Sequence, residues 1–408
     1  MPELKILLQH CGVIDPGDIR SYIDHGGFSA WRKAASRMSP AAVTAEVKAS
    51  GLKGRGGAGF PCGIKWELAQ KASADEKYLV CNADEGEVGA FKDRYLLQND
   101  PFSLIEGMAL AAYAIGARHA YIYLRAEYHH LLPVLQNAVD QAAEKGFLAG
   151  LSIQICEGAG AYICGEESAL MESIEGKRGD VRFRPPFPPS KGLWGKPTII
   201  NNVETLATIR HIIEKGSDWF RQIGTEQSKG TKLFSISGDV ADPGVFELVL
   251  GSRLKELVVD LAGVDDVKWV QVGGATGGLV PFSMLTTPLA YETVLGSGAV
   301  MVFNHTRDVL DFIHRTVSFL AEESCGKCTP CREGTEAMLR IVERLALGDG
   351  HAEDIQRLED LSETMMLSSL CGLGQAAAIP VLDTIRYFRN DVETRIKQAV
   401  FLRSIRIR

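Results

Sequence analysis

The fold is decided by residues 77–125, which read KYLVCNADEGEVGAFKDRYLLQNDPFSLIEGMALAAYAIGARHAYIYLR. The segment opens on an apolar strand at 77–82, continues into a helical stretch at 103–117 and returns to a strand at 119–125. The same alternation continues with a helix over 127–145, a strand at 151–157, and helices near 166–174 and 201–215. Strands that alternate with helices predict an α/β fold with a mostly parallel sheet covered on both faces.

The regions on either side have different patterns. Residues 1–50 predict short helices, and 230–305 hold short β-rich runs with turns, which indicate a small α+β module. After 307 helical periodicity continues to the end, which predicts a helical bundle. The loop 184–197 has five prolines in RPPFPPSKGLWGKP, so it cannot be regular structure, and long ordered loops are commonly functional.

Composition excludes several classes of protein. The 408 residues are 46% apolar and 23% charged, with a net charge of −7, which excludes wholesale disorder and gives no basic footprint for nucleic acid. The most apolar window, 104–117, is shorter than the ~18 residues that a membrane span needs. The opening MPELKILLQHCG lacks the features of a signal peptide, so we expect a cytoplasmic protein without a membrane span.

A cysteine run gives the strongest chemical signal. The segment 324–334, SCGKCTPCREG, has C-x2-C-x2-C spacing, and a fourth cysteine follows forty residues later in SSLCGLG. The four cysteines are Cys325, Cys328, Cys331 and Cys371. Such a run with a remote fourth thiolate suits a 4Fe-4S cluster, because each iron needs one sulfur ligand from the protein. Pro330 and Gly326 should keep the run out of a regular helix, and structural zinc or coincidence are the alternatives. The other five cysteines are expected to be small core residues.

A glycine-rich loop precedes the first strand. In GRGGAGF (54–60), Gly54, Gly56 and Gly59 match the G-x-G-x-x-G spacing of dinucleotide-binding turns, but the preceding residues predict a helix instead of a strand. The glycines would still let backbone N–H groups approach a planar or phosphate-bearing ligand. Phe60 could stack on a ring and Lys65 could bind phosphate or a flavin oxygen. A surface turn, core packing and a solvated charge are the respective alternatives.

Polar groups follow the predicted strands. NADEGE places Asn82, Asp84, Glu85 and Glu87 at the carboxyl end of the strand 77–82, where ligands bind in parallel sheets. Three carboxylates so close together repel one another unless water or ligand hydroxyls solvate them, and a solvated loop is the alternative.

Two further motifs place polar groups where helices are predicted to begin. They supply Gly165, Glu166 and Glu167 in YICGEE, and Asn201, Asn202 and Thr205 in INNVET. The helix dipole or capping would explain Glu166 and one asparagine, but not both asparagines.

These motifs occur in one order over residues 51–334: GRGGAGFPCGIKW, NADEGE, GAGAYICGEE, PPFPPSKGLWGKPTIINNVET and SCGKCTPCREG. Together they closely resemble the NADH-binding flavoprotein subunit of respiratory NADH:quinone oxidoreductase (complex I). This family includes the diaphorase subunits of NAD-linked hydrogenases, bifurcating hydrogenases and formate dehydrogenases. Gly372 after the distal cysteine is similar to the diaphorases, whereas DWFRQIGTEQSKG (218–230) is similar to complex I.

The resemblance implies three domains. They are a Rossmann-like FMN- and NADH-binding domain with its helical N-terminal segment (1–228), a ubiquitin-like, soluble-ligand-binding β-grasp domain (229–306), and a four-helix bundle with one 4Fe-4S cluster (307–408). The implied activity is NADH dehydrogenase (diaphorase): hydride passes from NADH to FMN, then single electrons pass through the cluster. Complex I is the main expectation for the parent complex. A soluble hydrogenase, a formate dehydrogenase or a bifurcating complex is the alternative, and a non-catalytic scaffold ranks below these.

The resemblance also implies site residues and partners. FMN would contact Gly54, Arg55, Gly56, Gly57, Lys65, Asn82, Asp84, Glu85, Gly165, Glu166, Asn201, Asn202 and Thr205. NADH would contact Phe60, Lys65, Glu87, Tyr162, Glu167 and Phe187. The cluster would take the four cysteines named above, and no side chain need act as acid or base. The expected partners are a thioredoxin-like 2Fe-2S subunit and a larger iron–sulfur subunit, through which the chain would lie at the periphery of the inner membrane.

Overall fold

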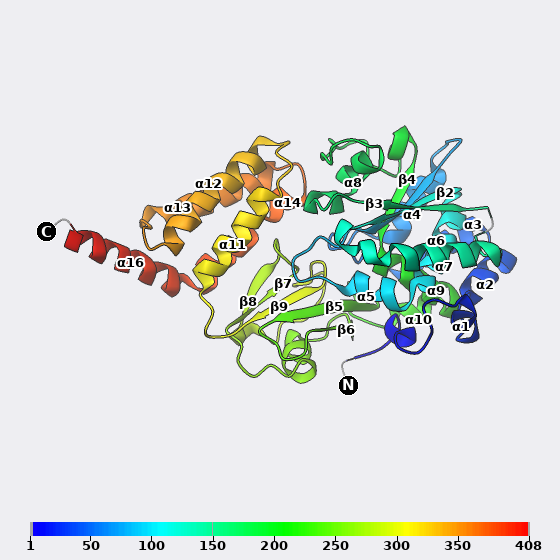
Figure 1. Ribbon diagram of the computed structural model, residues 1–408, viewed down its shortest axis with the longest axis horizontal. Coiled ribbons are helices and arrows are strands. Elements are labelled where there is room, and N and C mark those ends of the chain that lie inside the picture. Colours follow the sequence, from blue (N-terminus) through cyan, green and yellow to red (C-terminus); the bar gives the residue numbers. More distant parts are fainter. Residues whose placement is uncertain (1–2, 149, 407–408) are drawn as a thin grey trace.

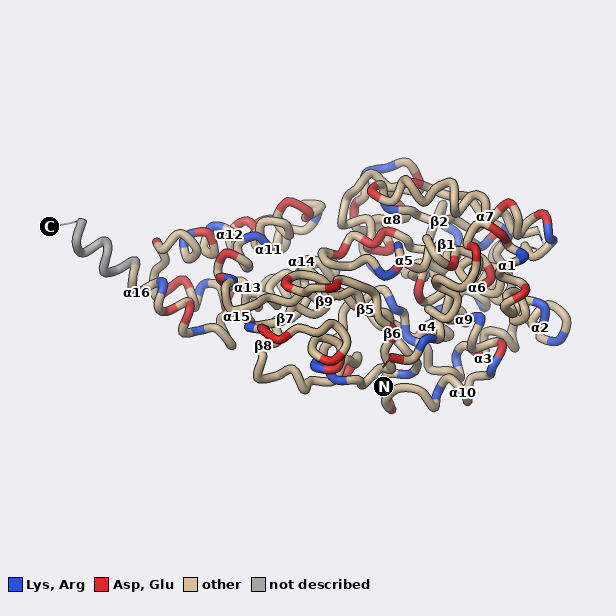
Figure 2. Tube along the Cα trace, turned by 60° about the horizontal axis from the view of Figure 1, so that its bottom comes forward, with Lys and Arg blue, Asp and Glu red and all other residues tan. Residues whose placement is uncertain are grey.

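The computed structural model describes residues 3–148 and 150–406 and contains two sheets followed by a helical region (Figure 1). Basic and acidic residues are interspersed along all three regions (Figure 2). The α/β region with a parallel sheet and the helical C-terminal region confirm the predicted fold class at this level.

The first sheet has the strand order β3-β2-β1-β4, and all its strands are parallel. Its strands are β1 (Tyr78–Ala83), β2 (His119–Leu124), β3 (Ser152–Glu157) and β4 (Thr198–Asn202). In β1, Leu79 and Cys81 belong to one buried cluster and Val80 to another, so the two faces of the sheet are both covered. The strand β4 was missed from sequence, where INN was read as a helix start, because only five residues separate Pro197 from the helix that follows.

Helices cover the face of this sheet that carries Leu79 and Cys81. The helix α6 (Pro101–Ile115) is buried along nearly its whole length and packs against β1 and α9 (Val203–Lys215). A Cβ at Gly107 would lie 2.1 Å from the Leu206 oxygen, so the close approach of α6 and α9 requires glycine. The apolar window of the sequence is therefore a core helix. Among the described residues, no helix is long and apolar enough to cross a membrane.

The other helical elements of this region are short. They are η1 (Leu8–His10), α1 (Ile19–Asp24), α2 (Ser29–Arg37), α3 (Pro40–Ser50), α4 (Cys62–Lys71), α5 (Lys92–Asn99), η2 (Ala126–Leu131), α7 (Leu132–Glu144), η3 (Tyr162–Gly165), α8 (Glu167–Ile174), η4 (Leu193–Gly195) and α10 (Ser217–Arg221).

The second sheet has the order β6-β5-β9-β7-β8. Its strands are β5 (Thr231–Gly238), β6 (Gly244–Val249), β7 (Trp269–Val272), β8 (Gly278–Pro281) and β9 (Ala299–Phe303). The π-helix η5 (Glu256–Leu261) and the 3-10 helix η6 (Phe282–Met284) lie in the connections between them. The central pair β5 and β9 is parallel, and the other pairs are antiparallel. One face forms its own buried cluster around Phe234, Ile236 and Val270.

One carboxylate ties the beginning of the described chain to this second sheet. Glu247 on β6 accepts hydrogen bonds from the backbone N–H groups of Ile6 (2.7 Å), Leu7 (2.8 Å) and Leu8 (3.1 Å). It also accepts a hydrogen bond from the Thr231 hydroxyl (2.6 Å). Burial raises the pKa of Glu247 to about 7. These contacts fasten residues 6–8 to a strand that lies far along the chain.

The last region is helical, and its final helix extends away from the body (Figure 1). Its helices are α11 (Val309–Glu322), α12 (Thr329–Ala346), α13 (Glu353–Ser368), α14 (Gly372–Ala376), α15 (Ile379–Tyr387) and α16 (Arg389–Arg406). Apolar side chains of these helices share one buried cluster with Val80 of β1 and Trp269 of β7. The three regions are therefore packed together through a common core.

Candidate functional site

The glycine-rich loop connects α3 to α4, so it follows a helix, as the sequence predicts. The loop is closed by a hydrogen bond from the Gly54 N–H to the Phe60 oxygen (2.9 Å). Gly59 has φ +67°, and a Cβ there would lie 2.6 Å from the Tyr291 ring. A Cβ at Gly56 would lie 3.2 Å from Asn202 Cβ, so the loop passes directly against the start of α9.

Arg55 and Thr205 hold the loop from inside the protein. Both side chains are fully buried, and the Arg55 backbone N–H donates to the Thr205 hydroxyl (2.8 Å). The Arg55 guanidinium donates to the Lys229 carbonyl (2.6 Å), in the segment just before β5. The two residues therefore fix the shape of the loop, and the Arg55 side chain points into the protein.

Asn82 and Asp84 lie at the carboxyl end of β1, as predicted. The Asn82 amide donates to the Gly165 carbonyl (2.8 Å) and accepts from the Asp84 backbone N–H (3.0 Å). Asp84 Oδ2 is buried and has no hydrogen-bond partner among the described residues. Burial raises the pKa of Asp84 to about 7, although the nearby Arg125 guanidinium opposes the shift. A buried oxygen without a partner is costly, so this position fits a ligand that would supply a donor.

Glu85 and Glu87 are satisfied by the protein, which corrects the expectation that they need a ligand or water. Glu85 accepts from the backbone N–H groups of Asp93 (3.0 Å) and Arg94 (3.0 Å) at the start of α5. Glu87 accepts from the Tyr162 hydroxyl (3.0 Å) and from the Ala275 N–H (2.7 Å) after β7. Burial raises the pKa of both carboxyls. The repulsion that the sequence suggested is relieved because each carboxylate points to different donors.

Glu166 and Glu167 begin α8. Glu166 caps the helix by accepting from the backbone N–H groups of Ser168 (2.9 Å) and Ala169 (3.1 Å), and it is also ion-paired with Arg184. Capping, the structural alternative, is therefore present for Glu166. Glu167 is ion-paired with Lys65, whose ammonium also donates to the Ile200 carbonyl (2.7 Å).

The two aromatic rings that the sequence resemblance assigned to NADH are exposed. Phe60 is 52% exposed and Phe187 is 55% exposed. Neither ring is used in core packing, so both have faces available for a planar ligand.

The two asparagines at the end of β4 have different partners. Asn201 is buried and accepts from the Trp66 indole N–H (2.9 Å). Asn202 caps α9 by accepting from the Glu204 N–H (2.9 Å), and its amide donates to Asp93 (2.6 Å). Capping thus explains Asn202, and the hydrogen bond from the Trp66 indole explains Asn201.

A buried charge network beneath Asn202 was missed from sequence. Glu204 lies 3.0 Å from the Lys92 ammonium and 2.5 Å from the Lys232 ammonium. Lys92 also lies 2.7 Å from Asp93, the residue that holds the Asn202 amide. The four charged side chains are almost completely buried. The sequence signals were Lys232 at the start of an apolar strand and Glu204 in an apolar helix.

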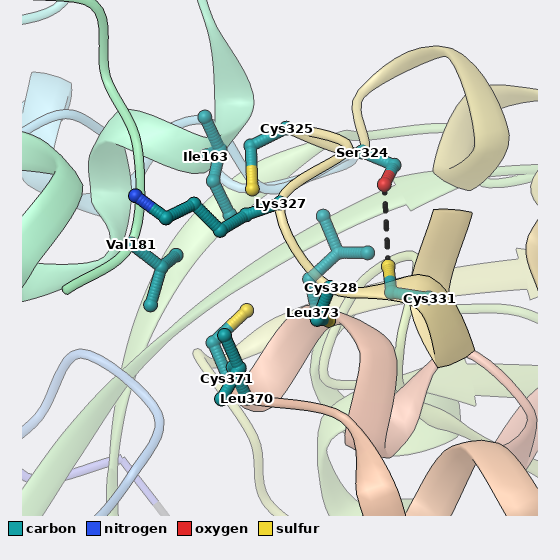
Figure 3. A pocket seen from close by; sticks show the side chains of 10 residues that line it. All are labelled: Ile163, Val181, Ser324, Cys325, Lys327, Cys328, Cys331, Leu370, Cys371 and Leu373. Atoms are coloured by element: carbon teal, nitrogen blue, oxygen red, sulfur yellow. Dashed lines mark hydrogen bonds between the residues drawn. The ribbon is translucent and has the colours of Figure 1, made fainter. Parts of the chain in front are cut away.

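The four cysteines lie around one pocket, which Figure 3 shows from close by. Cys325 and Cys328 come from the segment between α11 and α12, Cys331 lies in the first turn of α12, and Cys371 directly precedes α14. The expectation that Pro330 keeps the run out of a helix is wrong for Cys331: α12 begins at Thr329, because proline is tolerated in the first turn. The pocket is completed by Ile163, Val181, Ser324, Lys327, Leu370 and Leu373.

The donor set of this pocket fits an iron–sulfur cluster. Thiolates are the ligands of such clusters, and the four cysteines surround a space. Among the described residues, no group of three or more His, Cys, Asp or Glu side chains that could hold a metal ion is found, so the assignment rests on the four cysteines that line one pocket. Burial raises the pKa of the Cys371 thiol, although the backbone N–H groups of Gly374 and Leu373 oppose the shift.

Asp84 is expected to make stability depend on pH. Its pKa is about 7 in the folded chain, against an ordinary 3.8, so over this interval the folded state holds a proton that the unfolded state has released. The free energy of unfolding therefore falls as pH rises from 3.8 to about 7. Above this range Asp84 is ionised in both states and no longer makes stability depend on pH. In Asp84→Asn, we expect this fall to be smaller by roughly 1–3 kcal/mol.

Urea unfolding at pH 5 and pH 8 measures the difference. The matched control is Asp140→Asn, an exposed change on α7, which should leave the pH dependence as it was. An Asp84→Asn protein with an unaltered pH slope would contradict the assignment.

Comparisons with known proteins agree with this arrangement. Residues 47–211 match the family profile described as "Nuo51 FMN-binding domain", and residues 311–395 match "NADH-ubiquinone oxidoreductase-F iron-sulfur binding region". An NADH-quinone oxidoreductase subunit of Rhizobium meliloti is 42% identical, over 96% of this chain and 98% of that protein. The NADP-reducing hydrogenase subunit HndC of Solidesulfovibrio fructosivorans is 43% identical, over 97% of this chain and 84% of that protein.

A solved structure has the same fold. A chain of an NAD+-reducing [NiFe]-hydrogenase in the H2-reduced state superimposes with a TM-score of 0.88 and 42% identity, covering 96% of this chain and 67% of that one. These identities and coverages show that the chain is related to these proteins over almost its whole length. The chain therefore belongs to the family of FMN- and iron–sulfur-binding subunits that NADH-quinone oxidoreductases share with NAD-linked hydrogenases.

Proposed function

We propose that this chain is the subunit through which electrons enter a multi-subunit oxidoreductase: it oxidises NADH and delivers single electrons to partner iron–sulfur subunits. One observation carries the proposal. The segment η3 supplies Ile163 to the wall of the cysteine pocket, while Gly165, at its end, accepts the hydrogen bond from Asn82 at the carboxyl edge of β1. The predicted flavin site and the cysteine pocket thus share one short segment.

Further contacts hold the two sites together. The Arg178 guanidinium donates to the Cys325 carbonyl (3.1 Å), and the Tyr162 N–H donates to Glu323 (3.0 Å), just before the cysteine run. Glu87 joins Tyr162 to the loop after β7. All three regions of the chain therefore contribute to the junction between the two sites.

We assign the residues to cofactors as follows. FMN would be held by the glycine loop, the edge of β1, the start of α8 and the end of β4: Gly54, Gly56, Gly57, Lys65, Asn82, Asp84, Glu85, Gly165, Glu166, Asn201, Asn202 and Thr205, with Arg55 shaping the loop. NADH would meet Phe60, Lys65, Glu87, Tyr162, Glu167 and Phe187. The 4Fe-4S ligands would be Cys325, Cys328, Cys331 and Cys371.

Bound FMN supplies the change from a two-electron hydride donor to one-electron transfer, and the bound cluster supplies the one-electron acceptor. The residues of the chain bind and orient. Phe60 and Phe187 present exposed rings that can hold planar groups. Glu167, at the start of α8, is ion-paired with Lys65; in this proposal its carboxylate contacts a ribose, and its negative charge disfavours an added phosphate.

The middle sheet supports a ubiquitin-like (β-grasp) assignment. Its first and last strands, β5 and β9, lie side by side in parallel at the centre, with the antiparallel neighbours β6 and β7 outside them. The proposed boundaries 1–228, 229–306 and 307–408 fall in the connections before β5 and after β9.

The partners follow from the proposed electron path. We propose a thioredoxin-like 2Fe-2S subunit and a larger iron–sulfur subunit, with complex I as parent and peripheral attachment to the inner membrane through them. A hydrogenase, formate dehydrogenase or bifurcating complex is the second candidate, favoured by the similarity to HndC and to the NAD+-reducing hydrogenase.

The proposal predicts the cofactor content of the purified chain. Prepared anaerobically, it should contain about one FMN and about four irons, reduce ferricyanide with NADH, and reduce quinone poorly without partners. Gly59→Ala should lower the FMN content at least about tenfold, because the new Cβ would collide with the Tyr291 ring. Flavin and iron analysis of each preparation measures these quantities.

Gly146→Ala is the matched control. Gly146 also has a positive φ (+76°), but a Cβ there would meet nothing within 4 Å, so the same backbone strain is introduced away from the loop. Its FMN content should stay within about twofold of the unsubstituted chain. A colourless preparation without FMN or iron would contradict the proposed function.

A further inference from the structure

A serine hydroxyl lies against one of the four cysteines. Ser324 Oγ is 3.2 Å from Cys331 Sγ, drawn as the dashed line in Figure 3. A metal-bound cysteine is a thiolate, which can only accept, so with a cluster in place the hydroxyl must be the donor. Ser324 also accepts a long hydrogen bond from the Gly326 N–H (3.3 Å), which orients it beside the cysteine run.

A second serine hydroxyl lies beside the same cysteine without a partner. Ser369 is 6% exposed, and its Oγ has no hydrogen-bond partner among the described residues. A Cβ placed on Gly374 would lie 2.6 Å from Ser369 Oγ and 2.9 Å from Cys331 Cβ, so hydroxyl and cysteine approach the same point. A buried unpaired hydroxyl is costly, and a sulfur acceptor on the Cys331 side of the cluster would remove that cost.

We propose that the hydroxyls of Ser324 and Ser369 donate hydrogen bonds to the sulfurs on the Cys331 side of the bound cluster and raise its reduction potential. The inference rests on the proposed function, because it needs the cluster. The physical reason is charge: the reduced cluster carries one more negative charge on its sulfurs, so a fixed donor stabilises it more than the oxidised form. Neither serine is a ligand; both act through the sulfurs.

The potential of the cluster tests the proposal. In Ser324→Ala and Ser369→Ala, we expect the ratio of reduced to oxidised cluster at a fixed ambient potential to fall about three- to tenfold each. A tenfold fall corresponds to about 59 mV for a one-electron couple. The measurement is a redox titration of the complete, anaerobically purified chain, followed by electron paramagnetic resonance. Ser324→Thr, which keeps the hydroxyl, should restore the potential.

Ser368→Ala is the matched control. Ser368 is an exposed neighbour on α13 whose hydroxyl donates to the Thr364 carbonyl, so its removal should leave the potential unchanged. Iron and acid-labile sulfide are measured on every variant. A chain without iron before any substitution would overturn the proposed function, whereas alanine variants with full iron and an unshifted potential would overturn only this inference.

Loss of folding or of iron in Ser324→Ala would not end the test. Ser369→Ala removes a hydroxyl that has no hydrogen-bond partner within the described chain, so it breaks no hydrogen bond there and carries the potential measurement on its own. An unchanged potential in Ser369→Ala together with a shifted one in Ser324→Thr would reject the proposal, because the effect would then not follow the hydroxyl.

Discussion

Replacing Cys371 with alanine is expected to lower the bound iron at least about tenfold and to abolish electron delivery to partner subunits, because a 4Fe-4S cluster needs one thiolate for each iron. Cys371 is the one proposed ligand from outside the C-x2-C-x2-C run, and it lies directly before α14. Its loss leaves three cysteines among the residues that line the pocket.

The flavin site does not include Cys371, so FMN content and NADH-dependent ferricyanide reduction should be largely kept. Iron and acid-labile sulfide, FMN content and both activities are measured on the same preparation. Cys156→Ala is the control, since Cys156 lies half-buried on β3 and does not line the pocket. Full iron in Cys371→Ala would contradict the ligand assignment, and loss of FMN alone would show that the two sites are not separable.

Glu204→Gln is expected to destabilise the chain by about 3–5 kcal/mol, because it leaves the buried Lys232 ammonium without its carboxylate partner and Lys92 with Asp93 alone. Burial would raise the pKa of Glu204, but the ammonium groups of Lys232 and Lys92 hold it below its ordinary value. The carboxylate also accepts from the Leu233 N–H (2.8 Å), so it ties α9 to β5. Gln keeps the size of the side chain and removes only its charge.

Urea unfolding at constant pH measures this change. Glu214→Gln, an exposed change near the end of the same helix, should alter the free energy of unfolding by less than about 0.5 kcal/mol. We also expect weaker FMN retention in Glu204→Gln, since Lys92 holds Asp93 and Asp93 holds the Asn202 amide. A destabilisation below about 1 kcal/mol would mean that the network is not held by charge.

The sequence predicted what is encoded locally. The alternation of strands and helices predicted the parallel sheet. The close spacing of Cys325, Cys328 and Cys331 predicted that they lie together, because both patterns are visible along the chain. Position in the chain also placed Asn82 and Asp84 at the edge of β1. Capping rules anticipated the roles of Glu166 and Asn202.

The features that were missed depend on contacts between distant residues. Glu204 and Lys92 are more than a hundred positions apart, so their ion pair has no local signature. The same holds for Thr205, whose hydroxyl is used by the Arg55 N–H, and for the Trp66 contact of Asn201. In each case the residue itself is visible in the sequence, but its partner could be found only in the folded chain.

The hydrogen bonds from the backbone of residues 6–8 to Glu247 have a consequence for folding during synthesis on the ribosome. At about 5–20 residues per second, a ribosome needs roughly 10–50 s after making residue 8 to reach position 247. Throughout that interval the three backbone amides of Ile6, Leu7 and Leu8 have no carboxylate to receive them. The three amides therefore reach their native acceptor only after position 247 has been made.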